Sequence, residues 1–356
     1  MDMFSEAYAA AQSALKNGTL AGSFSAQQQA LKLLLAGAAG PDVAQCKSLD
    51  KVRETVASDA KAAKGGTGER AAARALIAGA GDGKGLVERA ATLKMLKHLH
   101  HVKSSGGQQI WVYSPPDVYT KWIFDECAGQ SATGLEDVLG KSSPDVYSPA
   151  QCEVMVNAVQ NARALALSVT TKLGAAASDD TRAVVRRYFG NAASTKTELD
   201  AVMATLSSGY QKIANACNAG NIVISDEPID RTGGGWKDWA FIYHEEKMSV
   251  IYLQGAWLKK AGEITPSNQP PLWRCVRTVV HELSHKECST EDVVYGPNGL
   301  KPEGSTALTP AYALHNADSW AYFAVDVVGY LTGPDKANGE KPATAILEVP
   351  VRTLTA

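Results

Sequence analysis

The stretch HELSHKECSTEDVVYG, residues 281–296, gathers several side chains that bind metal ions. His281 and His285 are four residues apart, so on a helix both side chains project from one face, one turn from each other. That spacing lets two imidazoles bind one zinc ion, while Glu282 can reach a water molecule on zinc without being a ligand. Zinc lowers the pKa of that water, and the glutamate takes its proton. The pattern therefore predicts hydrolysis of a carbonyl substrate.

This HExxH pattern of zinc peptidases lies at the end of a predicted helix, residues 267–285, which carries two prolines in its first turn. One face of the helix is apolar and consists of Leu272, Val276, Val279, Val280 and Leu283. A bare HExxH also occurs by chance on an exposed helix. The apolar face, the breaker after the motif and a nearby carboxylate favour the metal site.

The third ligand decides the class of site. A longer pattern, HExxHxxGxxH, does not fit, because Cys288 stands at the position of its glycine and Glu291 at the position of its third histidine. A later carboxylate, Asp318 or Glu303, is one alternative. The other is Asp292, which follows the helix directly.

The segment Ser289–Gly296 resembles the Gly-Thr-x-Asp-x-x-Tyr-Gly segment of the aspzincins, the deuterolysin and peptidyl-lysine metalloendopeptidase family, with serine in place of the first glycine. The resemblance covers roughly residues 148–330 and also includes AFIY, VIYLQGAW, NADSWAYFA and a YFG after a basic helix. The chain is similar as well to secreted bacterial aspzincin toxins.

The resemblance implies three ligands for one zinc ion, namely His281, His285 and Asp292. It implies that Glu282 is the general base and that Tyr295 donates a hydrogen bond to the oxyanion that forms on the scissile carbonyl.

The resemblance also implies a substrate-binding role for Asp318, which matches the aspartate of the S1′ pocket in lysine-specific members. The second acid of that pocket is replaced by Ala321, so selection for lysine after the scissile bond is expected to be weak. The step from His285 to Asp292 is shorter than in the family and requires a tight turn at residues 287–289.

Length and composition bound the architecture. The chain has 356 residues, 45% of them hydrophobic, and a formal net charge of -2, which favours neither nucleic acid nor a membrane surface as partner. No apolar run is long enough to span a membrane.

We predict a mainly α fold with a small antiparallel sheet (α+β). Residues 1–147 are predicted to form a helical N-terminal domain, and residues 148–356 a zincin-like metallopeptidase domain.

The role of residues 1–147 is open between a propeptide that inhibits the site intramolecularly and a targeting module. The first residues lack the basic and apolar regions of a signal peptide. The resemblance nevertheless implies a latent proenzyme, secreted or delivered extracellularly, that acts on protein or peptide substrates. A non-catalytic delivery or binding module on the same fold is the alternative from a different class.

Six cysteines show no CxxC pair, and the resemblance implies a disulfide between Cys152 and Cys217. The histidines 98, 100 and 101 have no carboxylate or cysteine nearby in the sequence, so we interpret them as a solvated helix end. The run from His244 to Glu246 is expected to be solvated at the tip of a hairpin.

Overall fold

The structure, a computed structural model, describes residues 3–16, 83–103, 109–140, 144–174, 177–218, 222–246, 248–265 and 267–347. The helices predicted between residues 17 and 82, and Cys46, lie outside the described residues.

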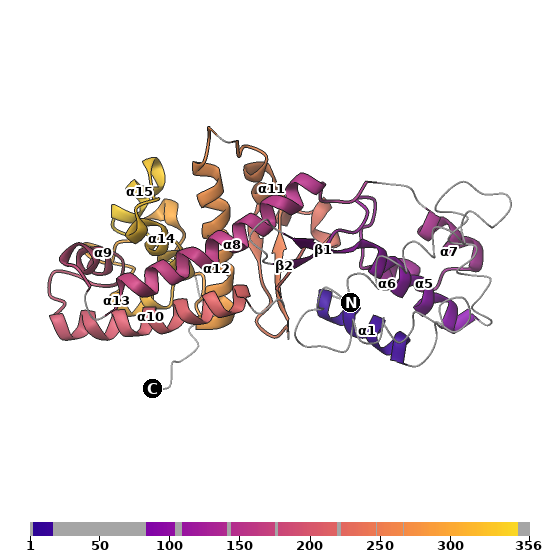
Figure 1. Cartoon of the computed structure of the whole chain (residues 1–356), viewed down its shortest axis with the longest axis horizontal. Helices are drawn as coiled ribbons and strands as arrows, with labels where there is room; N and C mark the ends of the chain where they lie inside the picture. The colour runs from indigo at the N-terminus through magenta and orange to yellow at the C-terminus, as the bar shows by residue number, and fades with distance from the viewer. Residues whose placement is uncertain are drawn as a thin grey trace. The chain divides into compact units, whose positions relative to one another are not determined.

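Helices predominate among the described elements, in agreement with the predicted fold class (Figure 1). The helices are α1 (Phe4–Lys16), α5 (Gly83–His98), α6 (Ile123–Cys127), α7 (Ala132–Gly140), α8 (Pro149–Lys172), α9 (Asp179–Phe189), α10 (Lys196–Asn218), α11 (Gly255–Ala261), α12 (Pro270–Cys288), α13 (Pro310–Leu314), α14 (Ala317–Val328) and α15 (Gly333–Glu340). The strands are β1 (Leu99–Lys103), β2 (Gln109–Tyr113), β3 (Ile222–Ser225), β4 (Ala240–Phe241) and β5 (Ser249–Leu253).

The strands form one sheet in the order β1-β2-β3-β5-β4. β1 and β2 pair antiparallel, whereas β2 with β3 and β3 with β5 pair parallel, with Trp111 opposite Val223 and Val223 opposite Val250. The sheet is therefore mixed, and the prediction of an antiparallel sheet was wrong. Parallel pairing requires long connections, and the apolar runs in the sequence do not reveal which distant strand each one pairs with.

The described residues group into two compact units. The first lies within residues 1–153, 219–239 and 245–256, and the second within residues 154–218, 240–244 and 257–356. β1, β2, β3 and β5 belong to the first unit, so this unit takes strands from both sides of the predicted cut at residue 147. That cut stays a prediction.

The first unit has an aromatic core. The rings of Phe4, Tyr113 and Trp122 contact one another, and Trp122 meets Tyr252 edge to face. The backbone N–H of Phe4 donates to the hydroxyl of Tyr252 across 2.7 Å. This bond joins α1 to the end of β5, at positions almost two hundred and fifty residues apart in the sequence.

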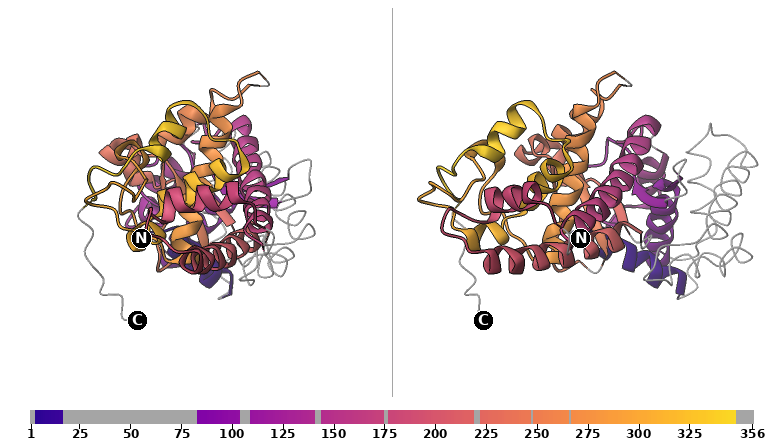
Figure 2. Two further views of the ribbon diagram at one scale, coloured as in Figure 1. Left: turned by 90° about the vertical axis from the view of Figure 1, so that its left-hand side faces the viewer. Right: turned by 60° about the vertical axis from the view of Figure 1, so that its left-hand side comes forward.

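The second unit is built around α12, which contacts α14 and α10 (Figure 2). Most of its predicted apolar face is buried, since Val276, Val280 and Leu283 are fully covered, while Leu272 near the start of the helix is half-buried. On α10, Gly209 allows close packing, because a Cβ atom there would lie 2.4 Å from the Trp320 ring. The contacts with α10 and α14 therefore fix the position of α12 and the direction of its histidines.

The five described cysteines are free thiols: Cys127, Cys152, Cys217, Cys275 and Cys288. The predicted disulfide between Cys152 and Cys217 was therefore wrong. Burial raises the pKa of the Cys152 thiol to about 11 and that of Cys217 to about 12, so neither is reactive at neutral pH.

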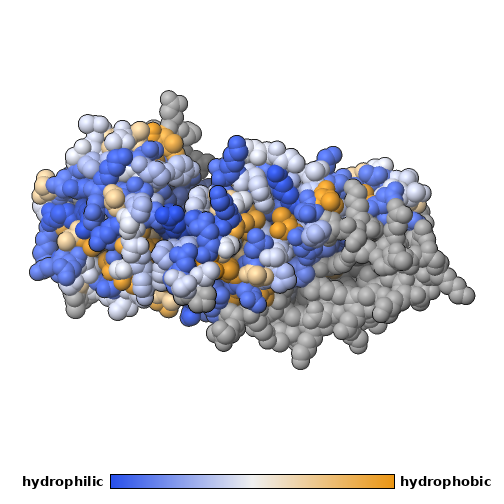
Figure 3. Space-filling model, turned by 90° about the horizontal axis from the view of Figure 1, so that it is seen from above, coloured by the Kyte–Doolittle hydropathy of each residue, from blue (hydrophilic) through white to orange (hydrophobic). Residues whose placement is uncertain are grey.

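The described helices include none that is long and apolar enough to cross a membrane. On the face shown in Figure 3, hydrophilic side chains cover most of the coloured surface, and the apolar ones form small separate patches.

Candidate metal centre

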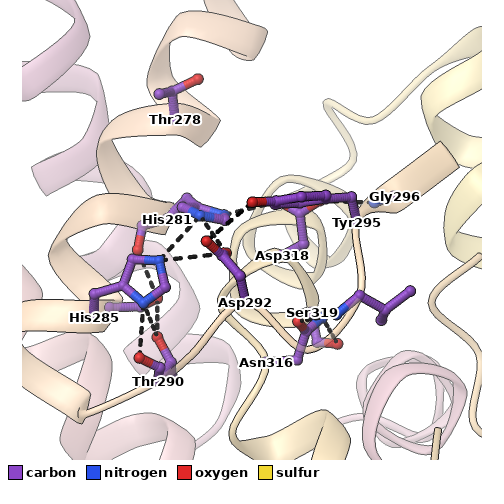
Figure 4. Close-up of polar contacts among 12 residues, drawn as sticks. Thr278, His281, His285, Thr290, Asp292, Tyr295, Gly296, Asn316, Asp318 and Ser319 are labelled. Carbon is purple, nitrogen blue, oxygen red and sulfur yellow. Dashed lines mark hydrogen bonds and ion pairs between the residues drawn. The ribbon is translucent and has the colours of Figure 1, made fainter. Parts of the chain in front are cut away.

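His281 and His285 lie one turn apart on α12 and turn their rings toward each other (Figure 4). Their ring centroids are 4.8 Å apart, and the two Nε2 atoms approach to 3.2 Å. The side chains are 12% and 8% exposed, respectively. Two imidazole nitrogens thus meet where both rings are largely shielded from solvent.

The other nitrogen of each ring already has an acceptor. His285 Nδ1 lies 2.7 Å from the carbonyl oxygen of Thr290, and His281 Nδ1 lies 2.8 Å from Oδ1 of Asp318. A carbonyl or a carboxylate can only accept, so Nδ1 carries the proton in both rings. In the neutral rings, both Nε2 atoms then present lone pairs to each other, an arrangement that requires a cation between them.

Asp292 completes the group. Its Oδ1 atom lies 3.1 Å from His281 Nε2 and 3.4 Å from His285 Nε2. The three donor atoms therefore form a triangle with edges of 3.1, 3.2 and 3.4 Å. Zinc bonds of 2.0–2.1 Å in a tetrahedron place neighbouring ligand atoms about 3.3 Å apart. Oδ1 is buried and accepts no hydrogen bond from the described residues, which fits an oxygen reserved for a metal.

A sharp turn brings Asp292 back toward α12. The helix ends at Cys288, and Ser289 adopts the left-handed conformation with φ 55° and ψ 40°. Its N–H donates to the carbonyl of His285, and the N–H of Thr290 donates to that of Ser284. The structure thus has the tight turn that the short step from His285 to Asp292 requires, and it places Ser289 where a glycine is usually favoured.

Asn316 holds the segment after the turn. It is fully buried, and its side-chain oxygen accepts the N–H groups of Val293 and Val294, each at 3.0 Å. Its side-chain nitrogen donates to Ser319 Oγ. In the sequence Asn316 looks only like a helix cap, yet its side chain makes no capping hydrogen bond to α14. Only the fold reveals its role as a positioning residue, because both N–H donors to its side-chain oxygen lie more than twenty positions away.

Asp318 lies beside the ligand triangle but not in it. One of its oxygens accepts from His281 Nδ1, and the other accepts from the N–H of Gly296 at 2.7 Å. Because Asp318 faces the wrong nitrogen of His281, the structure favours Asp292 as third ligand. Glu303, the other candidate, pairs with Lys301.

Gly296 makes the contact with Asp318 through its backbone. A Cβ at this position would lie 2.2 Å from the hydroxyl of Tyr322, so no larger residue fits without a shift. The glycine that ends the STEDVVYG segment therefore allows the chain to approach α14.

Glu282 and Tyr295 flank the same site. Glu282 is 3% exposed, and burial raises its carboxyl pKa above the ordinary 4.5. Tyr295 is 43% exposed, and its hydroxyl donates to Oδ2 of Asp292 at 3.1 Å. Burial, with the charge of Asp292 next, raises the pKa of Tyr295 further above 10.0, so the phenol stays a hydrogen-bond donor at neutral pH.

The electrostatics describe a site that attracts a cation. Burial is the largest single influence and would lower the pKa of His281 and His285, but the close contacts with Asp292 and the charges of the neighbouring carboxylates together outweigh it and raise both. Burial opposes ionisation of Asp292, yet the same two histidines hold its pKa well below 3.8. The two imidazoles and the carboxylate therefore bind positive charge strongly, as a proton or as a metal ion.

His244 reaches the site from a loop that we expected to be solvated. It is exposed, but its ring stands edge-on to that of His285, with centroids 5.7 Å apart. Lys286 donates to the carbonyls of Tyr243 and His244 and so holds this loop on α12. The expectation of solvated side chains is confirmed for His244 and Glu245, which are exposed. It was wrong for Glu246, which is 2% exposed and accepts from the Tyr252 hydroxyl.

One comparison, with the models of known protein families, agrees with this chemistry. The model of the aspzincin family, described as lysine-specific metallo-endopeptidase, matches residues 174–325. A zinc peptidase from Grifola frondosa is similar in structure at 20% sequence identity and a TM-score of 0.39, over 51% of this chain and 99% of that one. No curated protein matches the sequence.

The family match spans α9, α10, α12 and most of α14. It therefore includes all three residues of the ligand triangle and their hydrogen-bond partners. Over residues 174–325 the chain is similar to the aspzincin family, and this stretch contains the group of two histidines and one aspartate that could hold a metal ion.

Proposed function

We propose that His281, His285 and Asp292 hold the catalytic zinc ion of this metalloendopeptidase and that Glu282 moves the proton. The observation that carries the proposal is the triangle of two Nε2 atoms and one buried carboxylate oxygen, with edges of 3.1, 3.2 and 3.4 Å. When bound, zinc supplies a Lewis acid that polarises a peptide carbonyl and lowers the pKa of water toward ~7.

The chain's own residues perform the remaining steps. Glu282 accepts a proton from the attacking water and passes it to the amine that leaves. Burial raises its pKa, which suits a carboxylate that must bind and then release a proton. The Tyr295 hydroxyl is exposed enough to turn from Asp292 toward substrate, where it donates a hydrogen bond to the developing oxyanion.

Asp318 acts in this proposal as a positioning residue. Both of its oxygens accept hydrogen bonds within the protein, and its side chain is 14% exposed. Ala321, three residues later, is buried and offers no second carboxylate. These contacts support a peptidase whose cleavage is not confined to bonds before lysine.

The test replaces the carboxylate that accepts the proton with an amide of nearly the same shape. Glu282→Gln in the full chain is expected to lower casein hydrolysis about 10²–10⁴-fold, because proton transfer is lost, while zinc content measured by mass spectrometry stays the same. Glu287→Gln on the same helix is the matched control and keeps both activity and zinc. Full activity of Glu282→Gln would contradict the proposal.

Inhibition by residues 1–147 and export from the cell stay predictions. Deleting residues 1–147 is not a clean test of inhibition, because β2 pairs with β3 and its loss would open the sheet. A protease site inserted at residues 141–143 tests inhibition with the whole sequence present. A rise in activity after the cut supports a latent form, and unchanged activity counts against it.

A further inference from the structure

A second group of metal-ligand residues lies in the first unit, away from the aspzincin match. His98, His100 and Asp145 each offer one ligand atom, and these atoms lie within 4.8 Å of one another. His98 Nδ1 is 2.9 Å from one oxygen of Asp145, and His100 Nε2 is 3.2 Å from the other. The sequence contains no carboxylate near these histidines, and the fold brings one from 45 positions along the chain.

The backbone around the three side chains is well fixed. His98 ends α5, and its carbonyl accepts the N–H of Ser114, which follows β2. His100 lies in β1, opposite Val112 in the antiparallel pair. Asp145 forms a bridge with Pro116, so its position is set against the end of the same strand pair. Ligands on such elements need little rearrangement when an ion binds.

We propose that His98, His100 and Asp145 form a binding site for one divalent transition-metal ion such as Zn²⁺, separate from the catalytic centre. Two imidazole nitrogens and a carboxylate oxygen are the donor set that zinc and its neighbours in the first transition row prefer, whereas Ca²⁺ and Mg²⁺ prefer oxygen alone. The ring nitrogens that now face the carboxylate are the ones that would bind the ion. In each neutral ring the proton would then sit on the other nitrogen, and neither ring has to flip.

The three side chains differ in how far they are exposed to solvent, which suits an ion that enters from one side. The His98 side chain is 6% exposed, while those of His100 and Asp145 are 36% and 30% exposed. Three protein ligands leave a position for water on the open side. A bound ion would tie the junction of α5 and β1 to the segment that precedes α8, and it would therefore stabilise the first unit rather than take part in catalysis.

The experiment counts zinc on the full chain. Protein stripped with a chelator is titrated with Zn²⁺ by calorimetry, and retained zinc is measured by mass spectrometry after gel filtration. The wild type is expected to bind two equivalents. His100→Gln and Asp145→Asn are each expected to bind one, as is His285→Ala, and His285→Ala combined with His100→Gln is expected to bind none. His101→Gln, which changes the adjacent histidine, is the matched control and keeps two.

A thermal shift separates the ion from a simple hydrogen-bonded cluster. In the His285→Ala background, Zn²⁺ is expected to raise the midpoint of unfolding, and the rise is expected to vanish when His100→Gln is added. His100 is partly exposed, so this change removes a ligand without opening the core. The proposal is overturned if the wild type binds a single equivalent, if the second equivalent survives both His100→Gln and Asp145→Asn, if His101→Gln also removes it, or if Ca²⁺ gives the same shift.

Discussion

The direction in which each imidazole presents its lone pair decides the chemistry of the site at the scale of single residues. The Nδ1–H groups of His285 and His281 donate hydrogen bonds to Thr290 and Asp318, which leaves both Nε2 atoms facing Oδ1 of Asp292. Such partners orient a metal ligand and raise its basicity. The sequence predicts the two histidines from their spacing, but no spacing rule predicts that Thr290 acts through its backbone carbonyl.

Asp318→Asn tests whether this residue positions His281 or binds substrate. A neutral amide accepts the Nδ1–H bond more weakly, so zinc affinity or kcat/KM is expected to fall about 10–100-fold. The fall is expected for all peptides alike, measured by zinc titration and by mass spectrometry of the cut sites in a denatured protein mixture. A loss confined to bonds before lysine would instead assign Asp318 to the S1′ pocket.

The raised histidine pKa values predict how pH acts on the metal-free protein. Protons bind His281 and His285 more tightly in the folded apoprotein than in the unfolded chain, whose histidines titrate near 6.5. This contribution to stability is complete below pH 6.5 and is lost as pH rises through the higher folded pKa values. Because protons and zinc compete for the same Nε2 atoms, zinc affinity is expected to begin falling at a pH above 6.5.

Zinc titrations at several pH values, with denaturant unfolding of the chelated protein alongside, check both parts of this prediction. A zinc affinity that stays constant down to pH 6.5, or an apoprotein that gains stability as pH rises from 6.5, would contradict it.

At the scale of elements, the end of α12 and the start of α14 build the site together. The left-handed Ser289 turns the chain back, and Asn316 holds the returning segment by two backbone N–H groups. The sequence predicts α12 from its apolar face and the turn from the short step to Asp292. It does not predict the mixed sheet, because parallel partners such as β2 and β3 come from distant parts of the chain.

Ser289→Gly tests the turn. A residue with a Cβ is destabilised by about 1–2 kcal/mol in the left-handed region. Replacement by glycine removes this strain, but the greater conformational entropy of glycine in the unfolded chain offsets part of the gain. We expect Ser289→Gly to raise the free energy of unfolding by about 0.5–1 kcal/mol, and we expect Ser289→Ala, which keeps the Cβ, to change it little. Urea unfolding measures both. A less stable glycine variant would show that the serine hydroxyl contributes more than the strain costs.

At the scale of the whole molecule, the two units use different means of stabilisation. The second unit buries the apolar face of α12 between helices, and the first joins α1 to β5 through an aromatic core. The family resemblance suggested a disulfide, but the described cysteines are buried free thiols. Cysteine positions in a sequence give neither the distance nor the direction that a disulfide requires.

Reducing agents are therefore expected to leave both the melting temperature and the peptidase activity unchanged. Alkylation in denaturant without reductant is expected to label Cys152 and Cys217 along with the other described cysteines. A peptide pair linked through Cys152 and Cys217, found by mass spectrometry of the unreduced protein, would contradict the structure.

The most direct test of the catalytic site is a crystal structure of the zinc-loaded chain with diffraction data on both sides of the zinc absorption edge. We expect an anomalous peak about 2.0–2.2 Å from Nε2 of His281, Nε2 of His285 and Oδ1 of Asp292. Zinc at the two histidines with Asp318 as its third ligand, or no anomalous peak between them, would contradict the proposed metal site.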